Sequence, residues 1–247
     1  MSRRIVIAGN WKMNKTPSQA VEFIEQIVSD IDRSDREVVI IPPFVSIKDA
    51  WEKLNSTSVL LGAQNMHYES EGAYTGEISA EMLYELGCKY VLVAHSERRQ
   101  LFCESSPSIN LKIQKALDVG INPIFCVGEN LETRESGGTN ELIKSQLKSG
   151  FENVKIDNRV IIAYEPLWAI GTGKNATSEQ AEQVCLFIRD ELRSTYGGLA
   201  EEIRILYGGS VKASNAKSIL NMENIDGVLV GGASLTSDFI DIVNYDN

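Results

Sequence analysis

The sequence has no long apolar run, only two histidines and no clustered cysteines, and each of these absences excludes a class of protein. No stretch approaches the roughly 20 apolar residues of a membrane-spanning helix. The apolar run at positions 5–8 is too short for the core of a signal peptide. The cysteines are widely spaced, with no CxxC pair and no Cys/His cluster, so we expect no metal site and a reduced, cytoplasmic protein. They are Cys88, Cys103, Cys126 and Cys185.

Positive charge is also scarce, since 24 Lys and Arg face 34 Asp and Glu, for a formal net charge of −10. This balance argues against general affinity for nucleic acid or anionic membranes. An anionic substrate must be held by local groups against the overall field. No linker, low-complexity tract or shift in composition divides the 247 residues, so we expect one domain spanning 1–247.

Eight short runs rich in β-branched residues recur along the chain. Most are continuous rather than alternating, which is typical of strands buried on both faces of a parallel sheet. They are Ile5–Ala8, Val38–Ile41, Val59–Leu61, Tyr90–Val93, Ile124–Val127, Val160–Ala163, Ile203–Leu206 and Val228–Val230.

Helical patterns with readable starts lie between these runs. Positions 16–19 read Thr-Pro-Ser-Gln, a capping box with Pro at the first helical position. Ser106-Pro107 opens a second helix that stops at Gly120, and Thr177 with Gln180 opens a third. Eight strand–helix units in about 250 residues predict an α/β fold of the (β/α)8 barrel type. An open doubly wound sheet is the alternative.

A barrel predicts that functional residues directly follow the strands, at its carboxyl-terminal face. Glu165 follows the sixth run, and Pro166 disfavours the α conformation for it, so its carboxylate is expected to point into the barrel mouth as a general base. A salt-bridge partner is the alternative for such a residue. The Gly-Thr-Gly segment beginning at Gly171 favours the functional interpretation because it is typical of a mobile lid.

His95 and Lys12 are the candidate electrophiles. A lone histidine is more often structural, but Ser96–Arg99 can open a short helix whose N-terminus favours a neutral imidazole at His95. A neutral ring can donate to a carbonyl oxygen and move protons. Lys12, beside Asn10 after the first run, would attract a phosphate and stabilise a developing oxyanion, although a loop lysine is usually just solvated.

Two glycine pairs follow consecutive strands and indicate a phosphate site. Backbone N–H groups of Ser210, Gly231 and Gly232 would bind the phosphate, with Gly171 closing from the other side. Turn chemistry alone is the other explanation for such glycines. Three further side chains are assigned supporting roles: Glu97 and Glu129 to orient Lys12, His95 or the arginines, and Cys126 to packing.

Six segments together resemble the triosephosphate isomerase family, in order and over essentially the whole chain. They are AGNWKMN (8–14), HSERR (95–99), CVGE (126–129), AYEPLWAIGTGK (163–174), YGGSVK (207–212) and LVGGASL (229–235).

The resemblance implies interconversion of dihydroxyacetone phosphate and D-glyceraldehyde 3-phosphate, in glycolysis and gluconeogenesis, without metal or organic cofactor. It implies that Glu165 moves a proton between adjacent carbons and that neutral His95 polarises the carbonyl. Lys12 and Asn10 would stabilise the enediolate. Gly171, Ser210, Gly231 and Gly232 would bind the phosphate, and the segment 166–176 would close over the intermediate.

The resemblance also implies a homodimer in which the region from Gln64 to Glu77 inserts beside the partner's Asn10, Lys12 and His95. One departure is Ala94, where the family usually has Gly, and its added methyl is expected to shift the imidazole of His95 slightly. Two rival functions stay open on the residues alone. One is an aldolase-type lyase that uses Lys12 for a Schiff base, and the other is a phosphate-binding barrel without catalysis.

Overall fold

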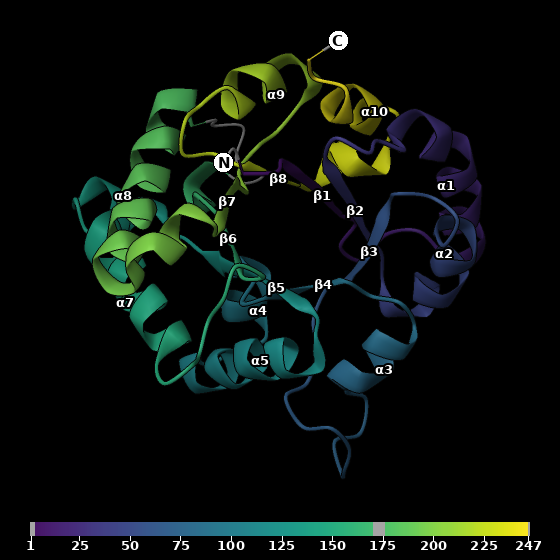
Figure 1. Ribbon diagram of the computed structural model, residues 1–247, viewed down its shortest axis with the longest axis horizontal. Helices are drawn as coiled ribbons and strands as arrows, with labels where there is room; N and C mark the ends of the chain where they lie inside the picture. Colours follow the sequence, from purple (N-terminus) through teal and green to yellow (C-terminus); the bar gives the residue numbers. More distant parts are fainter. Residues whose placement is uncertain (1–2, 170–175, 247) are drawn as a thin grey trace.

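The computed structural model describes residues 3–169 and 176–246, which form a closed barrel of eight parallel strands surrounded by helices (Figure 1). Each strand pairs with the next in the chain, and β8 returns to pair with β1. The predicted (β/α)8 barrel is thus confirmed, and the doubly wound alternative is wrong. The strands are β1 (Val6–Asn10), β2 (Glu37–Ile41), β3 (Leu60–Ala63), β4 (Tyr90–Val93), β5 (Asn122–Val127), β6 (Ile161–Tyr164), β7 (Arg204–Tyr207) and β8 (Gly227–Val230).

The closure between β8 and β1 depends on a glycine. Val6 is paired with Gly227, and a Cβ at Gly227 would lie 1.9 Å from the Val6 carbonyl oxygen. Gly227 also has φ +155°, where side chains are rarely tolerated. The first and last strands approach this closely only because no side chain stands between them.

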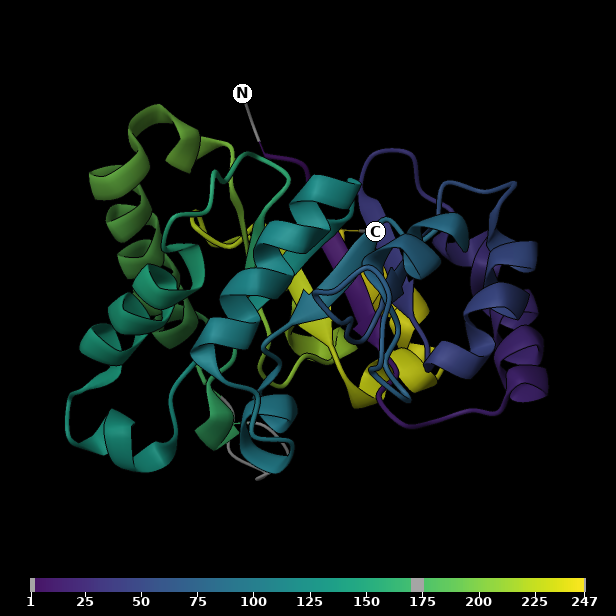
Figure 2. The same ribbon diagram turned by 90° about the horizontal axis from the view of Figure 1, so that it is seen from below.

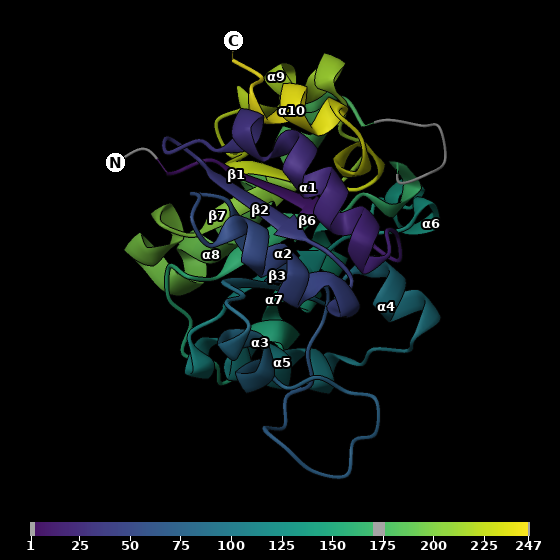
Figure 3. The same cartoon turned by 90° about the vertical axis from the view of Figure 1, so that its right-hand side faces the viewer.

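Helices cover the outside of the barrel (Figures 1 and 3). The capping boxes at Thr16 and Thr177 are present as predicted. The α5 helix begins at Ser106 as predicted, and Ser105 caps it, since the Ser105 hydroxyl accepts from the Ser108 N–H at 3.4 Å. Gly120 ends this helix in the left-handed conformation. The α-helices are α1 (Pro17–Ile31), α2 (Ile47–Leu54), α3 (Ala80–Glu85), α4 (Ser96–Leu101), α5 (Ser106–Val119), α6 (Leu131–Glu135), α7 (Thr139–Phe151), α8 (Ser178–Tyr196), α9 (Ala213–Leu220) and α10 (Asp238–Val243).

The buried side chains form two layers, as alternation along each strand requires. Residues such as Val6, Ala8 and Leu92 fill the barrel interior, whereas their neighbours Ile7 and Val93 pack against the outer helices. The strands are therefore apolar on both faces, which explains the continuous apolar runs of the sequence.

Figure 2 views the barrel from the side, with the N-terminus at the end where β1 begins. The segment between β3 and α3 extends beyond the ring of helices (Figures 1 and 3). None of the helices among the described residues is long and apolar enough to cross a membrane.

Candidate active site

A cavity of about 470 Å³ opens at the carboxyl-terminal ends of the strands. It brings together seven of the eight residues that the sequence singled out for catalysis or substrate binding: Asn10, Lys12, His95, Glu165, Ser210, Gly231 and Gly232. The eighth, Gly171, lies outside the described residues, as does most of the predicted lid. The cavity is also lined by residues that the sequence reasoning did not assign, among them Lys212, Leu229, Thr236 and Asp238.

Glu165 directly follows β6, and its carboxylate is almost completely buried, at 2% exposure. Its backbone N–H donates to the Val127 carbonyl at 2.7 Å, which fixes it against the end of β5. The carboxylate accepts from the Ser96 N–H at 2.9 Å and lies 3.0 Å from Nε2 of His95. A buried carboxylate that lies between an imidazole and the backbone N–H of a helix start, at the edge of the cavity, can exchange a proton with a ligand bound there.

Ser96 was missed as a site residue, although it lies inside the HSERR segment. It is the first residue of α4, so its N–H has no partner within the helix and is free to hold a carboxylate. Its hydroxyl also lies 3.4 Å from the second Glu165 oxygen. The sequence did predict a short helix directly after a strand. It did not show that the N–H at the start of this helix would bond to Glu165, which lies 69 residues away in the chain.

His95 caps the start of α4, and its Nδ1 accepts from the Glu97 N–H at 3.3 Å. Because an N–H donates to Nδ1, that nitrogen carries no proton, and the proton of a neutral ring is on Nε2, which faces Glu165. Burial lowers the pKa of His95, but the adjacent Glu165 carboxylate outweighs burial and raises the pKa overall. The neutral ring is therefore favoured by the helix start and opposed by Glu165 for as long as the two side chains touch.

Lys12 is held in place by three groups, from the end of β1, the residue after β3 and the helix α4. It adopts φ +54°, and its N–H donates to Oδ1 of Asn10 at 3.0 Å while its carbonyl accepts from Gln64 at 2.7 Å. Its ammonium lies 2.7 Å from the carboxylate of Glu97. Glu97 therefore contacts Lys12, one of the roles that the sequence left open for it, and a positive charge is fixed at the rim of the cavity.

The glycine-rich ends of β7 and β8 line the opposite side of the cavity. A Cβ at Gly209 would lie 2.2 Å from the Tyr207 hydroxyl, so this loop can pass over the tyrosine only as glycine. At Gly232, by contrast, a Cβ would meet nothing within 4 Å, and the space beside its backbone is open. Exposed backbone N–H groups next to a short 3-10 helix, Gly232–Leu235, suit an anion.

Glu129 and Cys126 lie outside this cavity. Glu129 is fully buried and accepts from the Tyr164 hydroxyl at 3.0 Å and Trp168 Nε1 at 2.9 Å, with Arg134 at 3.5 Å. Of the roles expected for it, contact with an arginine is the one observed. Burial raises the pKa of the Cys126 thiol well above its usual value, which is consistent with packing rather than nucleophilic chemistry.

Ala94, the residue before His95, is buried and has φ +65°. This is the left-handed region, where a glycine is unstrained and an alanine costs roughly 1–2 kcal/mol. The residue that departs from the family pattern therefore stands at a position whose backbone favours glycine. Its strain acts directly on the peptide that carries His95.

Within residues 3–169 and 176–246, no three His, Cys, Asp or Glu side chains are grouped so as to hold a metal ion.

Comparison with known proteins identifies relatives over the full length of the chain. The family model described as triosephosphate isomerase matches residues 5–246. A triosephosphate isomerase of Alkaliphilus oremlandii is 49% identical over 98% of this chain and 100% of its own length. That of Acetivibrio thermocellus is 50% identical over 99% of each chain, and that of Clostridium tetani is 46% identical over 98% of this chain and 97% of its own.

Proposed function

The chain belongs to the triosephosphate isomerase family, and from that premise we propose that it interconverts dihydroxyacetone phosphate and D-glyceraldehyde 3-phosphate, a step of glycolysis and gluconeogenesis. The observation that carries the proposal is one cavity in which a buried carboxylate, an imidazole and an ammonium face the glycine-rich ends of β7 and β8. A reaction that moves protons between adjacent carbons of a small phosphorylated sugar needs these groups.

Glu165 is the proposed base. Its carboxylate takes a proton from the carbon next to the carbonyl and returns it to the neighbouring carbon of the enediolate. The contact of 3.0 Å between Glu165 and Nε2 of His95 supports this role, because a substrate entering between them would meet both groups at once. Nε2 of His95, with its proton, donates to the carbonyl oxygen and moves the proton between the two oxygens.

Lys12 and Asn10 are proposed to stabilise the negative charge that develops on the substrate. Lys12 contributes a fixed positive charge, which interacts more strongly inside a water-poor cavity than in bulk solvent. Gly171, Ser210, Gly231 and Gly232 are proposed to bind the phosphate through backbone N–H groups. These roles need no metal or organic cofactor.

We also propose a homodimer in which the Gln64–Glu77 region of a second copy docks beside the active site. A recess of about 190 Å³ adjoins Asn10, Lys12 and His95, and it is lined by the exposed apolar side chains of Met13 and Phe102. Two further exposed apolar residues, Val45 and Leu101, are sequence neighbours of residues that line it. The projecting segment carries Tyr74, whose half-exposed ring packs against His67 in a tilted arrangement with 4.4 Å between the ring centres. Covering this apolar surface would favour association, and sedimentation equilibrium would show a monomer if the proposal is wrong.

A single domain over 1–247 and a cytoplasmic location complete the proposal. The pairing of β8 with β1 supports the single domain, because the barrel closes only when its first and last strands join in one sheet. The four free cysteines suit a reducing compartment.

The decisive experiment is exchange of the substrate C1 hydrogen with solvent deuterium, measured by NMR for wild type and Glu165→Ala. We expect exchange in the wild type and a loss of about 100- to 10,000-fold in the variant, which is the usual contribution of a general base. Glu152→Ala, which removes an exposed carboxylate at the end of α7, is the matched control and should exchange normally. Equal exchange by wild type and Glu165→Ala would contradict the assignment of the base.

The rivals predict other results. A lyase with a Schiff base at Lys12 would be labelled there by borohydride in the presence of substrate, and the isomerase should not be. A binding protein without catalysis would bind the sugar phosphate but show no exchange.

A further inference from the structure

Arg99 lies behind the active site and contacts neither the substrate cavity nor a carboxylate among the described residues. Its guanidinium donates from Nε to the Ala94 carbonyl at 3.1 Å and from a terminal nitrogen to the Cys126 carbonyl at 3.3 Å. It also lies 6.0 Å from the centre of the Phe125 ring. All three contacts are with residues at the ends of β4 and β5, next to α4 in Figure 1.

The two carbonyls belong to the backbone segments that hold His95 and Glu165 in place. The Ala94 carbonyl belongs to the peptide that leads into His95. Cys126 immediately precedes Val127, whose carbonyl accepts from the Glu165 N–H at 2.7 Å. One planar guanidinium therefore ties the backbone under the imidazole to the backbone that anchors the carboxylate. Because the guanidinium is planar and its donors have fixed directions, it holds two acceptors in a better-defined geometry than the flexible ammonium of a lysine would.

The backbone conformation of Ala94 explains why such a link is needed. With φ +65°, the alanine is held in a conformation that it would leave if the surroundings allowed it. Rotation of that peptide would turn the imidazole of His95 away from Glu165, to which it is joined at 3.0 Å. A bond to the Ala94 carbonyl resists this rotation directly, since the carbonyl is part of the rotating unit.

Arg99 is also costly to keep as a charge. Burial lowers its pKa, and the nearby charges of Glu104 and Glu165 offset this only in part, since no carboxylate among the described residues is hydrogen-bonded to Arg99. It lines a second cavity of about 180 Å³ together with Glu165 and Ser96. Arg99 is half-buried, and its hydrogen bonds to other described residues go to backbone carbonyls at one point of the barrel rim, so we ascribe its role to what those carbonyls position.

We propose that Arg99 is a positioning residue for the isomerisation, which holds the strained Ala94–His95 peptide against the end of β5 and so keeps the imidazole aligned with Glu165. The proposal rests on the proposed function for its kinetic consequence, but the alignment itself is a property of the free protein.

The first test is kinetic. In Arg99→Ala we expect kcat to fall about 10–100-fold with KM within about 2-fold, because misplacement of a reacting group by about 1 Å can cost up to about 100-fold. Guanidinium ion should restore part of the loss by entering the enlarged rear cavity. Arg99→Lys keeps the charge and one carbonyl bond, and it should fall between wild type and alanine. Arg159→Ala is the matched control, since Arg159 also donates to a backbone carbonyl, that of Leu117, but precedes β6 at the opposite end of the barrel. It should keep its kcat and show no guanidinium response.

The second test is independent of catalysis. Nitrogen-15 NMR of the imidazoles, with His95 assigned by comparison with His67→Gln, should show a single tautomer protonated at Nε2 in the wild type. In Arg99→Ala this pattern should change to a mixture, whatever the activity of the protein. If wild type does not isomerise the substrate, the proposed function fails, and this spectrum still tests the alignment.

The third test couples Arg99 to the strain. Glycine adopts φ +65° freely, so Arg99→Ala should cause a smaller fold-loss of kcat in an Ala94→Gly background than in wild type. Three results would overturn the proposal: a folded Arg99→Ala with wild-type kcat, an unchanged His95 tautomer in that variant, or the same fold-loss in both backgrounds.

Discussion

The backbone of Gly128 passes so close to Glu165 that substitution by alanine should damage stability and activity together. A Cβ at Gly128 would lie 1.8 Å from the Glu165 carbonyl oxygen and 2.7 Å from its carbonyl carbon. Since Cβ atoms essentially never approach other atoms within 3.0 Å, the two backbones must separate by about 1.2 Å, the difference between 3.0 and 1.8 Å. Gly128 cannot simply move away, because Gln146 bonds both its N–H (2.9 Å) and its carbonyl (3.0 Å).

The magnitude follows from this displacement. Overpacking costs about 1–3 kcal/mol, and loss of the bond from the Glu165 N–H to Val127 adds about 0.5–1.5 kcal/mol, so we expect Gly128→Ala to lose about 1.5–4.5 kcal/mol of stability. For a chain of this length that corresponds to a Tm lower by roughly 3–18 °C. Moving the base by about 1 Å should also lower kcat by about 100-fold.

Circular dichroism melting and a coupled assay of isomerisation would measure the two effects. Gly198→Ala is the control, because a Cβ there meets nothing within 4 Å and its φ is not positive. It should change stability by less than about 0.5 kcal/mol and leave kcat unchanged. A Gly128→Ala protein with the Tm and kcat of wild type would refute the reasoning, since the clash would then have been relieved without moving Glu165.

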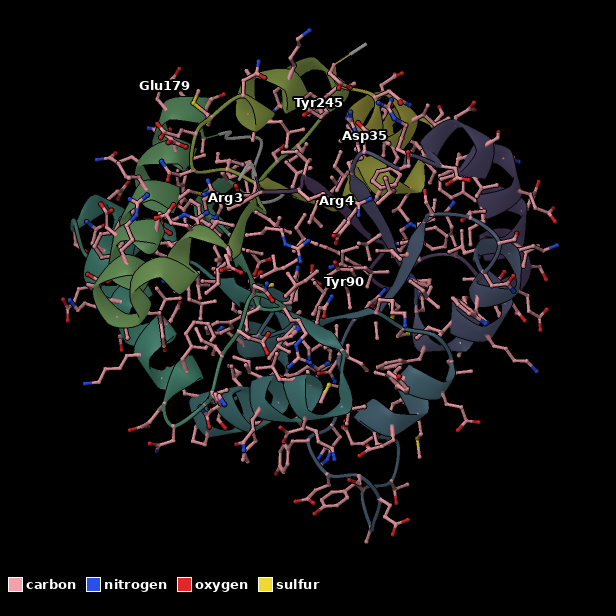
Figure 4. All side chains as sticks on the ribbon, in the orientation of Figure 1. Arg3, Arg4, Asp35, Tyr90, Glu179 and Tyr245 are labelled. Carbon is pink, nitrogen blue, oxygen red and sulfur yellow. The ribbon has the colours of Figure 1, made fainter. Side chains whose placement is uncertain are left out.

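Three further predictions concern the opposite end of the barrel, the thiols and the lysine. Tyr90 lies inside the ring of strands in Figure 4, hydrogen-bonded to Glu37, and burial raises its pKa to about 12. Because the unfolded tyrosine ionises near pH 10 and the folded one near 12, stability should fall by up to about 3 kcal/mol over that range, and Tyr90→Phe should show a shallower fall in alkaline melting curves; parallel curves would contradict this. Cys88, Cys126 and Cys185 are buried, and burial raises the pKa of each thiol, to about 12 for Cys88. A disulfide reagent should therefore titrate no more than one thiol of the native protein, Cys103, and four thiols after denaturation. A second fast-reacting thiol in the native protein would contradict the packing described here. Lys12→Ala should raise KM and lower kcat together in steady-state kinetics, because the charge acts on bound substrate and on the transition state alike; a loss of kcat alone would contradict a ground-state role.

Local features of the sequence predicted most of the barrel because its strands are apolar on both faces and its helices begin at clear caps. The eight runs each overlap one strand: one coincides with β4, and the other seven have one or both ends displaced by one or two residues, as at β1, which ends at Asn10 rather than Ala8. The displacement is expected, since a strand ends where pairing stops, and pairing is a property of two segments. The start of α5 at Ser106 and its stop at Gly120 were predicted correctly, because Pro107 and Gly120 are local signals that need no partner segment.

The residues of the candidate site were likewise predicted only in part from the sequence. Glu165, His95, Lys12 and the glycine pairs could be found from the sequence because in a parallel barrel every strand end points to one face, so position after a strand already implies proximity. Their roles came from the family resemblance. Gln146 and Arg99 could not be found, because each side chain bonds to backbone groups, at Gly128 for Gln146 and at Ala94 and Cys126 for Arg99, and backbone groups carry no side-chain signature. Ser96 stood in a segment that the sequence singled out, but its bond to the Glu165 carboxylate joins residues 69 positions apart.

The sequence by itself thus determined which residues meet at the barrel mouth, through the period and order of its strands. Only the tertiary structure decided how they meet: the 3.0 Å contact of Glu165 with His95, the pairing of Lys12 with Glu97 and the positive φ of Ala94. The physical reason is that patterning along the chain sets which face of an element is buried, whereas distances across the site depend on packing between strands that are far apart in the sequence.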